Sequence, residues 1–252
     1  MQKNLQQLLE NLILWLKYQR QAGIDEIPIQ ILAQIRQIDM AKEKKNIPSK
    51  GPGDNLSSIK SLSQLQTLVE QCELCELART RGKVVFGEGN PSPILMIIGE
   101  APGREEDIQG RPFVGRSGEL LTKMLRAINI DRKEVFITSV IKCRPPGNRT
   151  PSKKEINTCM PYLTRQIELL CPSIILCLGG IAAQSLLNVT KSLSSLRGKF
   201  YDLNGIKVTV TYHPAYLLRF GGMKQKDLKR KAWHDLQMLQ AEYEKYKKKT
   251  TG

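Results

Sequence analysis

The chain has 252 residues, of which 40% are hydrophobic, enough for one large α/β domain with an appendage or for two small domains. Lys and Arg number 39 against 24 Asp and Glu, and the net charge of +15 favours a polyanionic partner such as DNA or RNA; a basic tail on an unrelated enzyme is the alternative. This composition excludes wholesale disorder, and apolar runs such as 94–98 and 174–178 are far shorter than the roughly 20 residues of a membrane-spanning helix.

The first 56 residues predict a helical appendage followed by a linker. Leucines from Leu5 to Leu16 recur at helical spacing, which predicts an amphipathic helix over 3–20 and not a signal peptide. A second helical pattern follows Pro28, so the appendage is expected over 1–40. Residues 41–56 are charged and rich in Pro and Gly, which is typical of a linker. The appendage would cap the main domain or bind a protein partner. We expect a cytoplasmic protein whose cysteines stay reduced.

Residues 57–246 alternate predicted strands and helices. Buried or β-branched strands are predicted over 94–98, 135–141, 173–178 and 207–212. Four helices are predicted: one capped by Ser117 and running to Ile128, one from a capping box of Ser152 and Glu155 to about Leu170, a short one after Gly180, and a long one over Leu228–Tyr243. This order predicts a three-layer α/β/α fold around a mostly parallel sheet of about four strands. A basic tail is expected over 247–252.

Three polar loops follow the predicted strands. They cover residues 99–107, 142–151 and 213–222 and are rich in Gly, Pro and charged residues. Parallel sheets bind ligands beyond the carboxyl ends of their strands, so these loops are expected to form one site.

The six cysteines fall into two kinds. Cys72 and Cys75 form a C-x2-C pair, and Cys143 and Cys159 supply a second pair from further along the chain. Four thiolates fit either a tetrahedral zinc ion or an iron–sulfur cluster, and the spacing leaves both open, as it does two unliganded pairs. Cys171 and Cys177 are interpreted as core residues.

The motifs CELC (72–75), GEAPGREED (99–107), GRPFVG (110–115), KCRPPGNRTP (142–151) and HPA (213–215) occur in this order. Together they resemble the family 4 uracil-DNA glycosylases, the iron–sulfur members of the uracil-DNA glycosylase superfamily, over about residues 65–240. The resemblance implies a [4Fe-4S] cluster of structural role held by Cys72, Cys75, Cys143 and Cys159. It also implies DNA containing uracil as the substrate.

The resemblance implies two catalytic residues and a base pocket. His213 would donate a hydrogen bond to uracil O2, where negative charge develops. Glu100 would position water and favour the cationic sugar. Gly99 and Ala101 let the backbone approach the base, and Phe113 would stack on it. No lysine resembles a Schiff-base nucleophile, so a monofunctional glycosylase is expected.

The sequence departs from the family pattern at Ser139, where members often carry an Asn that reads uracil O4 and N3. A hydroxyl is shorter and is not bidentate, which leaves open the selectivity for uracil over cytosine and the range of bases excised.

After the HPA motif, Leu217 or Leu218 would be the wedge that fills the space of the flipped base, and Arg219 a phosphate or groove contact. The alternative is a short helix whose leucines pack on the sheet. Arg149 is a further candidate for DNA binding. Other basic or polar candidates are Arg144, Asn148, Lys153, Lys154, Lys224, Lys226, Lys229, Arg230 and Lys231. Glu105, Glu106 and Asp107 are interpreted as exposed acids of a first helical turn.

The sequence is compatible with three functions. The first is a uracil-DNA glycosylase of base-excision repair that leaves an abasic site. The second keeps the fold and accepts other deaminated bases because of Ser139. The third is a non-catalytic iron–sulfur DNA-binding module, against which Glu100, His213 and Phe113 together argue. A monomer is expected.

Overall fold

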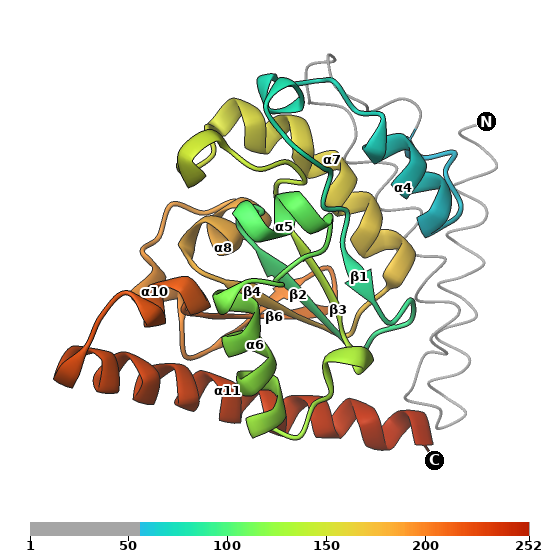
Figure 1. Cartoon of the computed structure of the whole chain (residues 1–252). Coiled ribbons are helices and arrows are strands. Elements are labelled where there is room, and N and C mark those ends of the chain that lie inside the picture. Colours follow the sequence, from blue (N-terminus) through green and yellow to red (C-terminus); the bar gives the residue numbers. More distant parts are fainter. Residues whose placement is uncertain (1–55, 252) are drawn as a thin grey trace, which may run out of the picture. The chain divides into compact units, whose positions relative to one another are not determined.

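The computed structural model describes residues 56–251 (Figure 1). The predicted appendage (1–40) and nearly all of the predicted linker (41–56) lie outside the described residues. Leu56, the last residue of that linker, is buried in the core of the domain. No helix among the described residues is both long and apolar enough to cross a membrane.

A single sheet lies between two layers of helices, which confirms the predicted three-layer α/β fold (Figure 1). The strand order is β1-β3-β2-β4-β6-β5. The strands are β1 (Glu88–Gly89), β2 (Leu95–Gly99), β3 (Phe136–Ser139), β4 (Ile174–Leu178), β5 (Phe200–Leu203) and β6 (Ile206–Thr211). The four central strands β3, β2, β4 and β6 run parallel and correspond to the four that the sequence predicts. The two additional strands, β1 and β5, are antiparallel edges.

Alternation along the buried strands divides the core between the two faces of the sheet. Met96 and Ile98 of β2 join one apolar cluster, whereas Leu95 and Ile97 join the other. The first cluster is covered by α4 (Leu62–Glu70), α7 (Lys153–Leu170), α8 (Gly180–Leu187) and α9 (Leu193–Leu196). The second is covered by α6 (Arg116–Ala127), α10 (Pro214–Leu218) and α11 (Gly222–Thr251). The short helix α5 (Arg104–Gln109) follows β2.

Three details of the structure differ from the prediction: the start of α6, the end of α11 and the exposure of one cysteine. Gly115, and not Ser117, is the N-cap of α6, because the chain enters the helix directly from the 110–115 loop. The predicted tail continues α11 to Thr251, and Lys247 pairs there with Glu134 at 3.0 Å. Cys177 is buried in β4, as predicted, but Cys171 is exposed: it is the C-cap of α7 in a left-handed conformation (φ 47°), and its Sγ donates to the carbonyl of Glu168 at 3.0 Å.

Candidate active site

The parallel strands place the ends of β2 and β3 side by side at the carboxyl edge of the sheet. Gly99 pairs with Ser139 across this edge. A Cβ atom at Gly99 would lie 2.8 Å from Cζ of Phe113 and 3.2 Å from Oγ of Ser139. The bare glycine backbone therefore allows these two side chains to lie together over it. Ala101 is half-buried two residues further on.

Glu100 is the acid nearest to this edge. Its carbonyl accepts a hydrogen bond from the backbone N–H of Ile141 at 3.1 Å, which fixes the end of β2. Burial raises the pKa of the Glu100 carboxyl, and the charge of Arg219 partly opposes this shift. A half-buried carboxylate with a raised pKa is a candidate for accepting a proton or orienting water.

Phe113 is buried in a strained loop and faces His213. Its backbone is left-handed (φ 52°), which is uncommon for an aromatic residue. Its ring centroid lies 5.5 Å from that of His213, with the planes tilted by 32°. The two rings thus line the same space at the sheet edge, from loops that lie about one hundred residues apart in the sequence.

His213 is held as a neutral hydrogen-bond donor. It is the N-cap of α10, and its Nδ1 accepts a hydrogen bond from the backbone N–H of Ala215 at 3.1 Å. Burial lowers the pKa of His213 to about 4; the charge of Arg219 also lowers it, and that of Glu106 opposes the shift. A neutral imidazole that accepts at Nδ1 carries its proton on Nε2. The free edge of the ring is therefore a donor.

Glu106 ties together the two loops that carry Glu100 and Phe113, which the sequence interpretation missed. Its Oε1 accepts from the backbone N–H groups of Val114 (2.9 Å) and Gly115 (3.1 Å). Its Oε2 accepts from the N–H of Gly103 at 3.2 Å. The prediction of an exposed acid is wrong for this residue.

Asp107 is also not an exposed acid. It is buried, and its Oδ1 accepts from the backbone N–H groups of Gly82 (2.9 Å) and Lys83 (3.3 Å). The carboxylates of Glu106 and Asp107 thus both accept hydrogen bonds from backbone N–H groups of neighbouring loops, because one side of α5 packs against those loops.

The two candidate wedge residues after His213 differ in exposure. Leu217 is 2% exposed and packs in the second core cluster, whereas Leu218 is 37% exposed. Of the two, Leu218 is the residue accessible to DNA. Tyr216, which precedes both leucines, is exposed, and its ring stacks on that of Tyr212 with the centroids 5.8 Å apart. Arg219 is exposed, and its charge acts on both Glu100 and His213, so it belongs to the site as well as to the surface.

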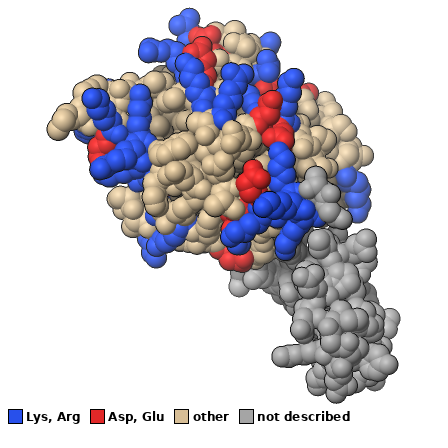
Figure 2. Space-filling view, turned by 90° about the horizontal axis from the view of Figure 1, so that it is seen from below, with Lys and Arg blue, Asp and Glu red and all other residues tan. Residues whose placement is uncertain are grey.

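Basic side chains surround one face of the domain. Figure 2 shows Lys and Arg side chains around the rim of the face on which α11 lies, with an uncharged area between them. The predicted basic residues at the start of α11 are all exposed: Lys224, Lys226, Lys229, Arg230 and Lys231. Arg230 and Lys231 pair with Asp227 at 2.8 and 2.7 Å, so two of the five are already partly neutralised.

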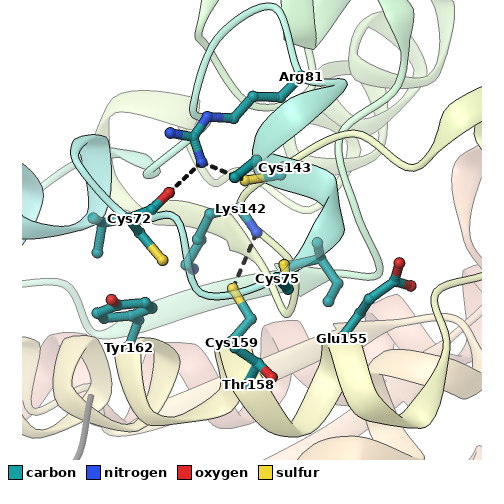
Figure 3. A pocket seen from close by; sticks show the side chains of 12 residues that line it. Cys72, Cys75, Arg81, Lys142, Cys143, Glu155, Thr158, Cys159 and Tyr162 are labelled. Carbon is teal, nitrogen blue, oxygen red and sulfur yellow. Dashed lines mark hydrogen bonds between the residues drawn. The ribbon is translucent and has the colours of Figure 1, made fainter. Parts of the chain in front are cut away.

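The four candidate ligand cysteines line one cavity. Cys72 and Cys75 follow α4, Cys143 follows β3, and Cys159 lies on α7, and Figure 3 shows their side chains around the same space. Among residues 56–251, no group of three or more His, Cys, Asp or Glu has the geometry to hold a single metal ion. The four thiols line one cavity, and thiolate ligands of this kind hold either zinc or an iron–sulfur cluster.

The chemistry around these sulfurs fits an iron–sulfur group. Nη1 of Arg81 donates to Cys143 Sγ at 3.3 Å, and the backbone N–H of Lys142 donates to Cys159 Sγ at 3.4 Å. Hydrogen bonds of this kind to ligand sulfurs are a feature of iron–sulfur sites. Burial raises the pKa of Cys143 and raises that of Cys159 to about 12, so a bound cation is needed to ionise them near neutral pH.

Arg149, a predicted DNA contact, makes an ion pair beside this cavity. Its guanidinium donates to both carboxylate oxygens of Glu155, at 2.7 and 2.9 Å, and lowers the pKa of Glu155 to about 2. Glu155 also completes the predicted capping box with Ser152, since its Oε2 accepts from the N–H of Ser152 at 2.7 Å. Arg149 therefore holds the 142–151 loop onto the start of α7.

Lys142 is a second functional candidate that the sequence did not reveal. Its side chain is 1% exposed, and its Nζ donates to Thr138 Oγ1 (2.6 Å), Ser139 O (2.7 Å) and Gln166 Oε1 (2.6 Å). Burial lowers the pKa of Lys142 to about 7. The residue links the base-pocket end of β3 to the loop that carries Cys143.

Comparisons with known proteins find similar sequences over much of the chain. Residues 86–237 match the family model of the uracil DNA glycosylase superfamily. The type-4 uracil-DNA glycosylase of Pyrobaculum aerophilum is 44% identical over 178 residues, covering 66% of this chain and 91% of that protein. Type-4 uracil-DNA glycosylases of Archaeoglobus fulgidus and Thermotoga maritima are 42% and 47% identical, over 64% and 60% of this chain and 84% and 80% of those proteins.

Proposed function

The chain belongs to the type-4 group of the uracil-DNA glycosylase superfamily, and we propose that it hydrolyses the bond between uracil and deoxyribose in DNA, leaving an abasic site. The observation that carries the proposal is the pairing of the Phe113 ring with a neutral His213 at the carboxyl edge of the sheet, where half-buried Glu100 directly follows β2. A base inside a duplex is out of reach, so the nucleotide must be flipped into this pocket.

His213 and Glu100 would each stabilise one of the two charges that develop as the glycosidic bond breaks. As the C1′–N1 bond breaks, electrons move to the uracil ring and positive charge develops on the sugar. The Nε2–H of His213 would donate to uracil O2, which becomes more negative. The Glu100 carboxylate would favour the cationic sugar and orient the water that adds to C1′, accepting its proton.

Phe113 and Ser139 would bind the base. The Phe113 ring offers a stacking surface, and stacking on an aromatic residue contributes about 1–3 kcal/mol. The Ser139 hydroxyl lies beside that ring over Gly99, where it can donate to O4 or accept from N3. Leu218 would occupy the space that the flipped base leaves, and Arg219 would contact phosphate.

We propose that Cys72, Cys75, Cys143 and Cys159 hold a [4Fe-4S] cluster, which, when bound, supplies a covalent tie between the 72–75 loop and the 143–159 segment. Iron, zinc and acid-labile sulfide per chain are measured in anaerobically purified protein. About four irons and four sulfides support the cluster; one zinc without sulfide contradicts it.

The glycosylase proposal is tested with oligonucleotides that carry one uracil, hypoxanthine or xanthine, single-stranded or opposite G or A, with alkali to reveal abasic sites. Cleavage at uracil alone supports the proposal. Cleavage at the other deaminated bases indicates that Ser139 broadens the pocket. Protein with a full cluster that binds DNA and cleaves none of these substrates is a binding module, and the enzymatic proposal fails.

From composition and cysteine chemistry we also propose a cytoplasmic monomer. Light scattering of the full chain tests the oligomeric state. The role of residues 1–40, as a cap or a binding site for a protein partner, is tested by comparing activity with and without them.

A further inference from the structure

Arg81 connects three segments around the cysteine cavity. Its Nη1 donates to the carbonyl oxygen of Cys72 at 2.7 Å and to Cys143 Sγ at 3.3 Å, and its Nη2 donates to the carbonyl of Glu70 at 3.3 Å. Figure 3 shows the guanidinium between Cys72 and Cys143, with both Nη1 contacts marked. One planar group therefore spans the end of α4, the C-x2-C loop and the loop after β3.

In the part of the chain that the structure describes, no carboxylate pairs with Arg81, which lines the cavity. The one carboxylate in the lining, Glu155, is paired with Arg149 at 2.7 Å. A cavity with four thiols and an unmatched guanidinium is suited to a group of net negative charge, and four thiolates outweigh the positive charge of an iron–sulfur core.

The fork of the guanidinium explains why an arginine occupies this position. A carbonyl oxygen and a sulfur from two different loops accept from the same Nη1, while Nη2 reaches the third segment. A lysine ammonium is a point charge and cannot span three acceptors in one plane with the same geometry. Arg81 thus offers both charge and fixed geometry, and the two can be separated by substitution.

We propose that Arg81 is a positioning residue for the cluster: it holds the Cys72 and Cys143 loops at their separation and stabilises the negatively charged Cys143 sulfur that binds iron. The inference rests on the cluster proposed above. Partners of this kind, one step out from the ligands, change metal affinity by about 10–100-fold when removed. The readout is therefore retention of iron, independent of glycosylase activity.

The test compares Arg81→Gln, Arg81→Lys and Arg79→Gln in the full chain. Arg79 is a matched control, since it lies two residues away, is 80% exposed and pairs with Glu76 at 3.1 Å, outside the cavity lining. Iron and sulfide are counted after anaerobic purification, and the rate of iron release to a ferrous chelator is then followed in air. Arg79→Gln is expected to match the unaltered chain, and Arg81→Gln to release iron about 10-fold faster. Arg81→Lys should fall between them, because it keeps the charge and loses the fork.

Equal release rates for Arg81→Gln and Arg79→Gln, both starting with a full cluster, overturn the role of Arg81 and leave the cluster intact as a proposal. If Arg81→Gln does not fold, Arg81→Lys decides: release faster than from Arg79→Gln supports the inference, and equal release overturns it. An unaltered chain without iron and sulfide overturns the cluster itself, and uracil excision by that chain would show that the glycosylase proposal stands without it.

Discussion

Replacement of Glu106 by Gln should damage the active site without touching a catalytic group. The Glu106 carboxylate accepts three backbone N–H groups, from Gly103 at 3.2 Å, Val114 at 2.9 Å and Gly115 at 3.1 Å. Gln keeps one oxygen and replaces the other by an NH2 group. If the oxygen stays on Val114 and Gly115, the amide faces the Gly103 N–H donor to donor.

The size of the effect follows from these three contacts. Two hydrogen bonds change from charged to neutral acceptors, a loss of about 1 kcal/mol each. The third is lost and leaves the half-buried N–H of Gly103 without this partner, about 1 kcal/mol more. The left-handed backbone of Phe113 (φ 52°) adjoins these contacts and costs about 1–3 kcal/mol to maintain. Relaxation of the 110–115 loop therefore costs less free energy than keeping Phe113 in this conformation without the Glu106 carboxylate. Phe113 would then leave its stacking position, and we expect kcat/KM to fall by about 10–100-fold, the value of one stacking contact.

The assay is kcat/KM on an oligonucleotide with one uracil, together with the thermal melting temperature. Glu105→Gln is the control, because Glu105 is exposed on the same turn of α5. Relaxation predicts a large loss of activity with a small change in melting temperature for Glu106→Gln. A kcat/KM for Glu106→Gln within twofold of that for Glu105→Gln would refute the assignment of Glu106 as the tie between the two loops.

Three further predictions concern the pocket itself. His213→Ala should lower kcat by about 100-fold or more, while the Kd for uracil-free DNA, measured by fluorescence anisotropy, stays unchanged; loss of DNA binding instead would contradict a donor role. Because the pKa of His213 is about 4, below its ordinary value of 6.5, the imidazole stays neutral as the pH falls from 8 to about 5, and the acid limb of kcat/KM belongs to Glu100, whose pKa is raised above 4.5. Arg219→Gln should therefore move that limb to higher pH and Arg219→Lys should not, and an unmoved limb would separate Arg219 from Glu100. Ser139→Ala should lower kcat/KM for uracil by about 10-fold, one neutral hydrogen bond, and equal rates would exclude a base contact.

The sequence predicted the layers of this fold because its signals are local. The central strands β2 and β4 are continuous apolar runs, β3 and β6 contain β-branched residues, and the capping box of Ser152 and Glu155 is complete within four residues. The edge strand β5 also has a local signal in the sequence, because Asn204 and Gly205 are typical residues of a two-residue hairpin, and both have positive φ (52° and 82°) in the turn between β5 and β6. The two-residue strand β1 has no such signal.

The supporting residues of the site could not be found from the sequence, because their partners are distant and are mostly backbone groups. Glu106 looks like any acid in a first helical turn, and Arg81 lies 62 residues from Cys143, the sulfur it contacts. A lysine in a polar loop is expected to be solvated, yet Lys142 is fully enclosed by β3 and Gln166. In each case the side chain chemistry is ordinary and the fold supplies the role.

Keeping His213 neutral is consistent with the charges that cleavage creates on the two sides of one bond. An imidazolium would stabilise the departing uracil more strongly than a neutral ring does, but it would also place a positive charge within a few ångströms of the cationic sugar. Two like charges about 5 Å apart repel by about 3 kcal/mol at the effective dielectric of such sites. A neutral Nε2–H donor keeps most of the benefit at O2, where a single preorganised donor contributes about 3–4 kcal/mol, without that repulsion. The anionic Glu100 can then act on the sugar, and Arg219, whose charge lowers the pKa of both residues, keeps Glu100 ionised and His213 neutral at the same pH.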